Sequence, residues 1–270
     1  MSSVVDPSTS ATEEMLRGIA ERLRAAEASG KPIAPLTEGR PELTVGDAYA
    51  IQAINAESRE AEGAAIVGRK IGLTSKPMQE MLGVGEPDYG CIYDDRLHTS
   101  GHEIDSGELI APRIEPELAF VLREDLRGPG VSREDVLAAT DHVVASMEVI
   151  DSRIADWRIG LIDTIADNAS CASVILGERR VPVAGLALES VGVELAVDGE
   201  VVQRGTADAV LGHPAEAIAW LANALGRFGV TLAAGQIVMS GSITAAAPVE
   251  TGAVISADFG ELGTVEARVR

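Results

Sequence analysis

The chain has 270 residues, with 22 basic and 42 acidic side chains, which give a formal net charge of −20 at pH 7. A surface of this charge repels phosphate backbones and anionic bilayers, so we expect the protein to bind neither nucleic acid nor membrane. Hydrophobic residues make up 46% and aromatic residues only 3%, so we expect a globular core built from Ala, Val, Leu and Ile.

Two helices are predicted near the N-terminus. Apolar residues recur at helical spacing over residues 12–28, and again over residues 46–60, where Thr44 can cap the first turn. Between them, residues 30–44 are punctuated by Gly and Pro and read as a loop. Residues 1–62 are therefore expected to form an N-terminal helical segment.

Short apolar runs alternate with turn signals from residue 65 onward, a pattern typical of a strand-rich α+β domain over residues 63–270. A hairpin is expected over residues 193–205, because Asp198-Gly199 suits a type I′ turn. Helices are expected over residues 75–82, 131–140 and 213–225. The remaining predicted strands cover residues 65–73, 114–122, 142–151, 236–243, 253–260 and 264–270.

The predicted strand at residues 114–122 carries two glutamates on one face, Glu115 and Glu117. The next strand, residues 142–151, holds Glu148 among Val and Ile. Paired glutamates are most often part of a solvated strand face, but these lead into apolar sequence, where a free carboxylate is costly. Three such carboxylates suit a hard cation with oxygen ligands, Mg²⁺ or Mn²⁺. Spacing alone leaves both interpretations open.

Two further polar residues are candidates for acid–base chemistry. Lys70 lies in the apolar strand at residues 65–73, where it either extends its amine to solvent or is partly buried with a lowered pKa. Asp88 lies in EPDYG, whose composition is typical of a turn. The alternative to a role in acid–base chemistry is that it is an ordinary turn aspartate. Ser170, in ADNAS, and the SGSIT sequence at residues 240–244 offer weak ligand-binding signals.

Other features of the sequence bear on location and class. Cys91 and Cys171 lack metal-type spacing and indicate no disulfide framework, which suits a reducing cytoplasm. The first 16 residues lack the basic and apolar regions of a signal peptide, and no run of about 18 apolar residues predicts a membrane span. The glycine-rich phosphate loops and the GxSxG motif are absent. We therefore expect a cytoplasmic protein.

Five blocks of sequence, in order, resemble the motifs of the 2-keto-4-pentenoate (2-hydroxypenta-2,4-dienoate) hydratases of the fumarylacetoacetate hydrolase superfamily. The blocks are GRKIGLTSKPMQEMLGVGEPDYG, PRIEPELAFVL, MEVIDSRIADW, DTIADNAS and MSGSITAAAPV. The resemblance runs from about residue 15 to the C-terminus. It implies a mixed β-roll core around a divalent metal, with a smaller N-terminal helical part.

The same resemblance implies roles for individual residues. Glu115, Glu117 and Glu148 would be ligands of Mg²⁺ or Mn²⁺, and Lys70 and Asp88 would be the acid–base pair. The substrate pocket would be lined by Ser170, Ser240 and Ser242. The activity implied is hydration of 2-hydroxypenta-2,4-dienoate to 4-hydroxy-2-oxopentanoate in meta-cleavage catabolism of aromatic or steroid compounds.

Two alternatives stay open beside the hydratase. The first is a 4-oxalocrotonate decarboxylase, whose SGxIT ending the SGSIT sequence resembles. Asp88 favours the hydratase, because an aspartate there would repel the distal carboxylate of a diacid. The second is a non-catalytic partner of a sister pathway enzyme, which the intact Lys70, Asp88 and acidic residues disfavour. The resemblance also implies a homo-oligomer, with a sister-enzyme complex as a further expectation.

Overall fold

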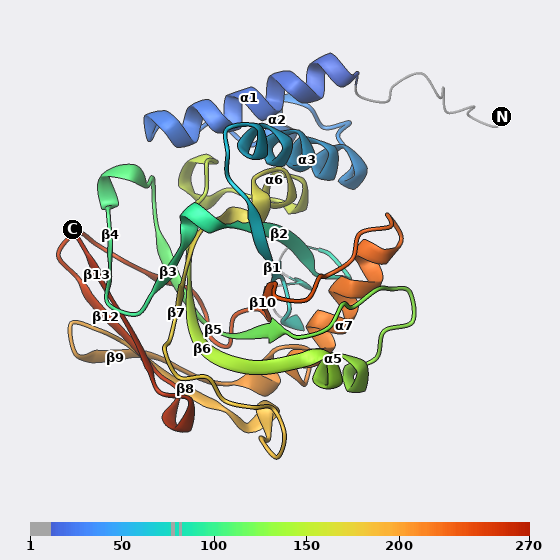
Figure 1. Cartoon of the computed structure of the whole chain (residues 1–270). Helices are drawn as coiled ribbons and strands as arrows, with labels where there is room; N and C mark the ends of the chain where they lie inside the picture. Colours follow the sequence, from blue (N-terminus) through green and yellow to red (C-terminus); the bar gives the residue numbers. More distant parts are fainter. Residues whose placement is uncertain (1–11, 77–78, 81–82) are drawn as a thin grey trace.

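The structure is a computed structural model that describes residues 12–76, 79–80 and 83–270 (Figure 1). Two sheets and a layer of N-terminal helices make up the fold. The helical layer consists of α1 (Glu13–Ser29), α2 (Leu36–Gly39) and α3 (Val45–Ala61). Thr12 and Thr44 cap α1 and α3, and Gly30 ends α1 in the left-handed region. Both N-terminal helices predicted from the sequence are confirmed.

The larger sheet is strongly curved and mixed (Figure 1). Its β1–β10 and β3–β7 pairs are parallel, and the other pairs are antiparallel. Its strands in spatial order are β2 (Asp88–Tyr93), β1 (Ile66–Gly72), β10 (Ile237–Met239), β5 (Arg113–Leu122), β6 (Thr140–Ile150), β7 (Cys171–Leu176) and β3 (Leu97–Thr99), with β11 (Ala247–Pro248) paired to β5. The expected mixed β-roll with its smaller helical part is confirmed.

The smaller sheet packs against the outside of this curve. Its strands in spatial order are β4 (His102–Ile104), β13 (Thr264–Val269), β12 (Val254–Asp258), β8 (Gly192–Val197) and β9 (Glu200–Thr206). β8 and β9 form the predicted hairpin. Asp198 and Gly199 both have positive φ, 52° and 81°, as a type I′ turn requires.

Three helices and several single 3₁₀ turns complete the described elements. The helices are α5 (Arg133–Ala139), α6 (Leu161–Ala166) and α7 (Pro214–Gly226). Ser132 caps α5 and His213 caps α7. The 3₁₀ turns are η1 (Asp94–Arg96), η2 (Ser106–Glu108), η3 (Ala155–Trp157), η4 (Asn168–Ser170), η5 (Leu188–Ser190), η6 (Ala207–Ala209) and η7 (Gly260–Leu262). The helix expected over residues 75–82 includes residues 77, 78, 81 and 82, which lie outside the described residues.

Three of the apolar clusters in the core hold the sheets and helices together. The largest fills the space between the two sheets and beneath α5 and α7. A second joins α1 and α3 to α6 through residues such as Ile51 and Ile165. A third, with Ala119, Val144 and Met239, lines the concave face of the larger sheet. The division of the chain at residue 62 stays a prediction.

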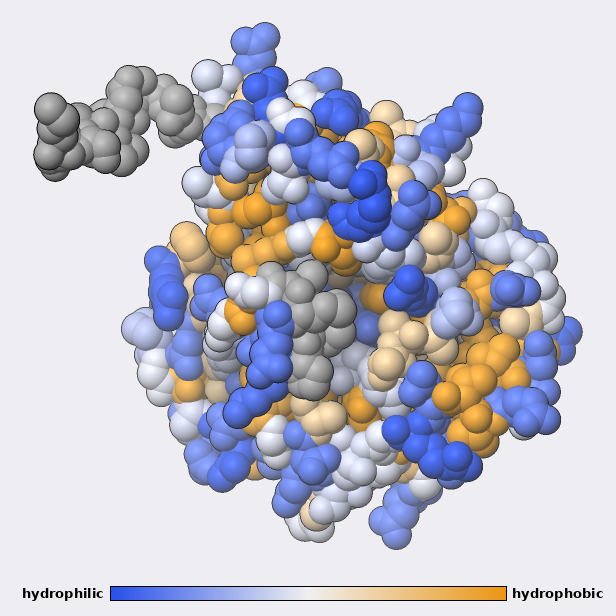
Figure 2. Space-filling model, turned by 180° about the vertical axis from the view of Figure 1, so that it is seen from behind, coloured by the Kyte–Doolittle hydropathy of each residue, from blue (hydrophilic) through white to orange (hydrophobic). Residues whose placement is uncertain are grey.

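The outer surface is largely hydrophilic (Figure 2), as expected for a chain with 24% charged residues. In Figure 2, hydrophilic side chains cover much of the face seen from behind, with hydrophobic residues in smaller groups between them. Among the described helices, none has the length and apolar character needed to cross a bilayer.

Several local predictions were wrong. Asp88 does not lie in an exposed turn; it is the first residue of β2, and only 1% of it is exposed. The strand predicted over residues 236–243 ends at Met239, because Gly241 turns the backbone with a φ of +107°. The sequence reading also missed β3, β4, α6 and β7.

Candidate metal centre and active site

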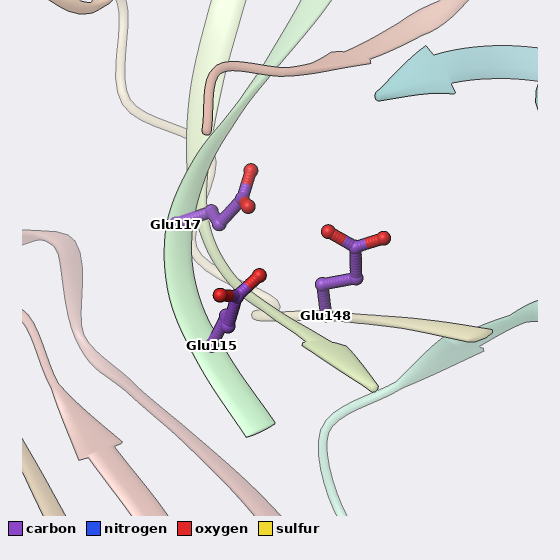
Figure 3. A group of neighbouring side chains, drawn as sticks. All are labelled: Glu115, Glu117 and Glu148. Carbon is purple, nitrogen blue, oxygen red and sulfur yellow. The ribbon is translucent and has the colours of Figure 1, made fainter. Parts of the chain in front are cut away.

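Three glutamates converge on the concave face of the larger sheet (Figure 3). Glu115 and Glu117 extend from the same face of β5, and Glu148 extends from the neighbouring β6, where it is the direct partner of Glu115. One carboxylate oxygen from each lies within 4.8 Å of the others. Alternation of side chains along a strand therefore puts two of the carboxylates together, and antiparallel pairing adds the third.

The three carboxylates repel one another in a setting that holds little water. Glu117 and Glu148 are at most 1% exposed, and Glu115 is partly exposed. Burial, together with the Glu148 carboxylate, raises the pKa of Glu115 to about 7. Burial and the other two carboxylates also raise the pKa of Glu117 well above its ordinary range. Such a cluster is stable in its ionised form only when positive charge compensates it.

The donor set fits a hard divalent cation. Beyond its ion pair with Lys70, neither buried oxygen of Glu148 has a hydrogen-bond partner in the described part of the chain. Buried oxygens of this kind normally have a partner, so these two are free for a ligand. Carboxylate oxygens are the ligands that Mg²⁺ and Mn²⁺ prefer. One oxygen of Glu117 is held by the backbone N–H of Gly241 at 2.8 Å, which fixes the direction of this side chain.

Lys70 extends from β1 into the same space and is only 3% exposed. Its Nζ lies 3.2 Å from Glu148 Oε1 and donates to the backbone oxygen of Ala169 at 2.8 Å. Burial by itself lowers the pKa of the Lys70 amine, but the Glu148, Asp88 and Glu115 carboxylates outweigh it and raise that pKa above its ordinary value. The neighbouring carboxylates thus favour the charged form of the Lys70 amine, and the lowered pKa considered from the sequence is not found.

Asp88 lies across from Lys70, above Gly72. Gly72 pairs with Asp88 in the β1–β2 ladder, and a Cβ on Gly72 would overlap Asp88 Oδ1 and come within 3.5 Å of Lys70 Nζ. Only glycine leaves room for the carboxyl here. Thr164 Oγ1 on α6 donates to Asp88 Oδ2 at 3.1 Å. Burial raises the pKa of Asp88, against the opposing effects of Lys70 and the Thr164 hydrogen bond, so this carboxyl is a stronger base than an exposed aspartate.

The turn η4 closes one side of the site in an unusual conformation. Asn168, Ala169 and Ser170 all have φ between 50° and 58°. Each non-glycine residue in this region costs about 1–2 kcal/mol, so the turn persists only because its surroundings hold it. The Asn168 side chain supplies one such constraint, accepting from Cys91 N at 2.7 Å and donating to Cys91 O at 3.0 Å.

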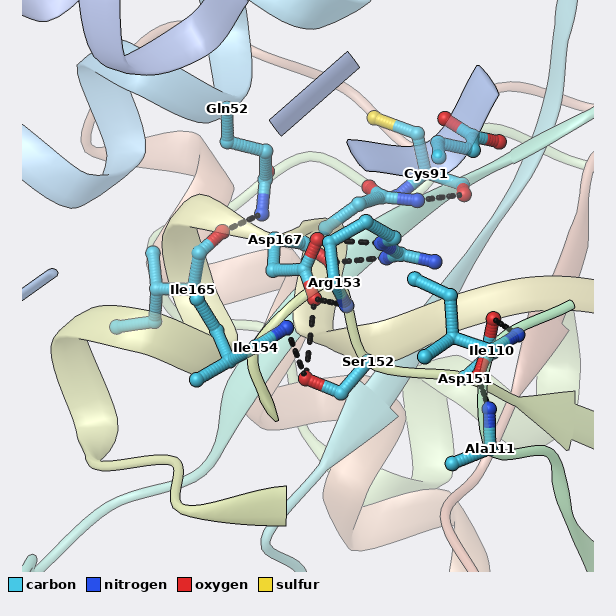
Figure 4. Close-up of polar contacts among 12 residues, drawn as sticks. Gln52, Cys91, Ile110, Ala111, Asp151, Ser152, Arg153, Ile154, Ile165 and Asp167 are labelled. Carbon is cyan, nitrogen blue, oxygen red and sulfur yellow. Dashed lines mark hydrogen bonds and ion pairs between the residues drawn. The ribbon is translucent and has the colours of Figure 1, made fainter. Parts of the chain in front are cut away.

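A buried ion pair supplies the second constraint on η4 (Figure 4). Arg153 Nε donates to Asp167 Oδ1 at 2.5 Å, and the Arg153 guanidinium also donates to the Asp167 backbone oxygen. The second carboxylate oxygen of Asp167 accepts from the Arg153 backbone N–H. Asp167 is therefore a structural anchor for the turn that receives the Lys70 hydrogen bond.

The three predicted pocket serines differ in their surroundings. Ser170 and Ser240 are buried, and neither hydroxyl has a hydrogen-bond partner among the described residues. Ser170 follows Ala169, the acceptor for Lys70, and Ser240 precedes Gly241, the donor to Glu117, so both adjoin the site. Ser242 donates instead to the Thr244 backbone oxygen at 2.8 Å. Its hydroxyl is thus engaged within its own loop.

Sequence reasoning missed the residues that support the site. Gly72, Thr164 and Arg153 were not singled out, because their importance depends on neighbours that are distant in the chain. Gln52 gave the one usable signal: it is a polar residue beside the apolar stripe of α3, and it is 6% exposed. A buried glutamine needs partners for its amide, which points to a specific polar contact.

Comparison with known proteins agrees with this geometry. Residues 44–270 match the family described as Fumarylacetoacetate (FAA) hydrolase C-terminal. The chain belongs to the fumarylacetoacetate hydrolase family. Among the relatives of this family member is the 2-hydroxyhexa-2,4-dienoate hydratase of Comamonas testosteroni, 46% identical over 86% of this chain and 89% of the relative. The 2-keto-4-pentenoate hydratase of Paraburkholderia xenovorans (strain LB400) is 42% identical over 94% of each chain.

A solved structure of the same family has the same fold over nearly its whole length. The 4-oxalocrotonate decarboxylase from Pseudomonas putida G7, complexed with magnesium and adipate, superimposes with a TM-score of 0.94 at 39% identity. The alignment covers 97% of this chain and 99% of that one. This chain thus shares its architecture with a decarboxylase, and the reaction has to be argued from the site.

Proposed function

We propose that this fumarylacetoacetate hydrolase family member is a divalent-metal hydratase of 2-hydroxypenta-2,4-dienoate (2-keto-4-pentenoate), a hydro-lyase of aromatic meta-cleavage catabolism. The observation that carries the proposal is the buried triad of Glu115, Glu117 and Glu148, with Lys70 against it and Asp88 opposite. The names of the two relatives above support hydration as the reaction. The magnesium in the related decarboxylase structure supports Mg²⁺ as the cation, with Mn²⁺ as the alternative.

The triad would hold the cation, which would supply Lewis-acid polarisation of the 2-oxygen of the bound substrate. Hydration requires loss of the C2 hydroxyl proton and addition of a proton at C5. Water then adds at C4 with loss of its second proton, and a proton is added at C3, so that the net addition of one water gives 4-hydroxy-2-oxopentanoate. Lys70 Nζ is buried within 3.2 Å of Glu148 and close to Asp88, a position suited to hold and deliver a proton inside the site. Asp88, with its raised pKa, is suited to orient the water and accept its proton.

The serines would complete the pocket. The hydroxyls of Ser170 and Ser240 are buried and free to donate to substrate oxygens. Ser242 would contribute through its backbone rather than its hydroxyl, which is bonded to Thr244. These assignments place hydrogen-bond donors around an anionic headgroup inside a protein of net charge −20.

Asp88 favours a neutral substrate tail over a second carboxylate. A dianionic substrate would bring another negative charge toward a buried carboxyl whose nearest compensating cation, Lys70, is already ion-paired with Glu148. The second candidate is decarboxylation of 4-oxalocrotonate, which the SGSIT sequence at residues 240–244 and the 39% identity to the decarboxylase support. The acidic site and the buried lysine would serve either reaction.

The deciding experiment is to incubate the purified protein with Mg²⁺ and each substrate separately. We expect 2-hydroxypenta-2,4-dienoate to be consumed with formation of 4-hydroxy-2-oxopentanoate, followed by loss of dienoate absorbance and by NMR of the product. CO₂ release from 4-oxalocrotonate without hydration of the dienoate would refute the hydratase assignment. Absence of both reactions, with Mg²⁺ binding intact, would instead support the role of a non-catalytic partner.

We further propose that the protein works in the cytoplasm as a homo-oligomer, in which a sister pathway enzyme can also take part. Light scattering of the purified protein tests the first point, and co-purification with the neighbouring pathway enzyme tests the second. A monomer at all concentrations that support turnover would contradict the oligomer.

A further inference from the structure

Gln52 connects the two segments that carry Asp88 and its hydrogen-bond donor. Its Nε2 donates to the backbone oxygen of Tyr89 and to that of Ile165, both at 2.9 Å. Tyr89 directly follows Asp88 on β2, and Ile165 directly follows Thr164 on α6. The Gln52 contact to Ile165 is visible in Figure 4, where Gln52 descends from α3.

The contact is buried and its orientation is unambiguous. Gln52 is 6% exposed, and both of its partners are carbonyl oxygens. Only the NH₂ end of the amide can donate to both, so the two hydrogens on Nε2 are fully used. Tyr49, almost one turn earlier on α3, stacks on Tyr89 with ring centroids 4.4 Å apart. Helix α3 therefore contacts Tyr89, at the start of β2, through the Gln52 hydrogen bond and through the Tyr49 ring.

The position of Asp88 depends on the separation of β2 and α6. The Thr164 Oγ1–Asp88 Oδ2 hydrogen bond crosses between them at 3.1 Å. Gly72 bounds the carboxyl on the opposite side. We propose that Gln52 is a positioning residue, which holds β2 and α6 at the spacing that lets Thr164 aim the Asp88 carboxyl at the reacting carbons. This inference rests on the proposed function and assigns the N-terminal helical layer a part in it.

The metal triad is independent of this clamp. Glu115, Glu117 and Glu148 lie on β5 and β6, and the hydrogen bonds of Gln52 reach neither strand. Loss of the clamp should therefore change catalysis without changing metal affinity. Substitution of a residue that merely stabilised the fold would instead lower both catalysis and metal affinity.

The test compares Gln52→Leu with Asn55→Ala. Leu has a similar size to Gln and no donor. Asn55, on the same helix, accepts from Arg24 on α1 at 2.6 Å, its only side-chain hydrogen bond among the described residues, and provides the matched control. We expect Gln52→Leu to lower kcat by about 10- to 100-fold, because a displacement of the order of 1 Å has that effect on a reacting group. KM and the Mg²⁺ dissociation constant should change less than about twofold, and Asn55→Ala should retain wild-type kcat.

A double-mutant cycle identifies the route. Thr164→Val removes the hydroxyl, and Thr164→Ser keeps it and should retain activity. If Gln52 acts through Thr164, the Gln52→Leu, Thr164→Val double variant should be no slower than the slower single variant. Independent, multiplicative losses would overturn the inference, as would an equal kcat loss in Asn55→Ala. Should Gln52→Leu fail to fold, Gln52→Met replaces it in the same comparison.

One measurement does not depend on turnover. A crystal structure of Gln52→Leu or Gln52→Met should show the Thr164 Oγ1–Asp88 Oδ2 separation lengthened beyond 3.5 Å. An unchanged separation would overturn the role of Gln52 even in an active enzyme. If the wild-type protein hydrates no dienoate, the proposed function fails, yet this distance still decides whether Gln52 positions Asp88.

Discussion

The close approach of Gly72 to Asp88 makes Gly72→Ala a sharp probe of the site. A Cβ at this position would overlap Asp88 Oδ1, and the carboxyl must move by about 1 Å to restore ordinary contact. Displacement of a reacting group by this distance lowers turnover by about 100-fold. The new methyl would lie 3.5 Å from Lys70 Nζ, an ordinary contact, so we expect Lys70 and the metal ligands to stay in place.

The measurement is a double-mutant cycle on kcat, with Mg²⁺ affinity followed by calorimetry. Asp88→Ala removes the atoms that the new methyl would strike, so Gly72→Ala should cost less than about twofold in that background. Gly18→Ala on α1, where an added Cβ meets no atom within 4 Å, is the benign control. A second 100-fold loss in the Asp88→Ala background would show that Gly72 acts through the strand rather than through Asp88, and would refute the reasoning.

Three further predictions concern the charges of the site. Lys70→Met should lower kcat by about 10²–10⁴-fold with Mg²⁺ binding retained, and a change confined to KM would restrict Lys70 to substrate binding. Glu148→Gln should abolish tight Mg²⁺ binding, as measured by calorimetry. In the wild type, Mg²⁺ at 100 times its Kd should raise Tm by about 5–10 °C, and the variant should lack this rise. In EDTA, the free energy of unfolding should fall as pH rises from 4.5 to about 7, since the folded state holds the Glu115 proton over that range and the unfolded chain does not. Urea denaturation should show that the free energy of unfolding falls by at most about 3 kcal/mol over this pH range. Glu115→Gln has no titrating group at this position, so its free energy of unfolding should fall by less. An equal pH dependence in both proteins would contradict the assignment.

The acidic residues show how far local sequence can predict a site. Glu115 and Glu117 are two positions apart on a strand, so their shared face follows from backbone geometry alone. Glu148 was recognisable because a carboxylate within an apolar strand needs a partner. The helices were equally local: Thr44 and Asp47 form their capping box within one turn of chain.

The supporting residues depended on tertiary structure. Asp88 reads as a turn residue in EPDYG, and only its pairing with Gly72 makes it the buried start of a strand. Likewise, Thr164 and Arg153 have ordinary sequence surroundings, and both they and Gln52 acquire their roles from partners far along the chain or in another element. Strand β7 and helix α6 were missed for the same reason, because packing, not propensity, decides such short elements.

The amino-acid sequence by itself therefore determined the N-terminal helices, the longer strands and the shared face of Glu115 and Glu117, since those follow from periodicities of two and about 3.6 residues along the backbone. Tertiary structure decided which polar groups face those acids and which carbonyls Gln52 joins. Contacts between residues 37 and 113 positions apart have no local signature, because they exist only once the sheet has curved and the helical layer has closed over it.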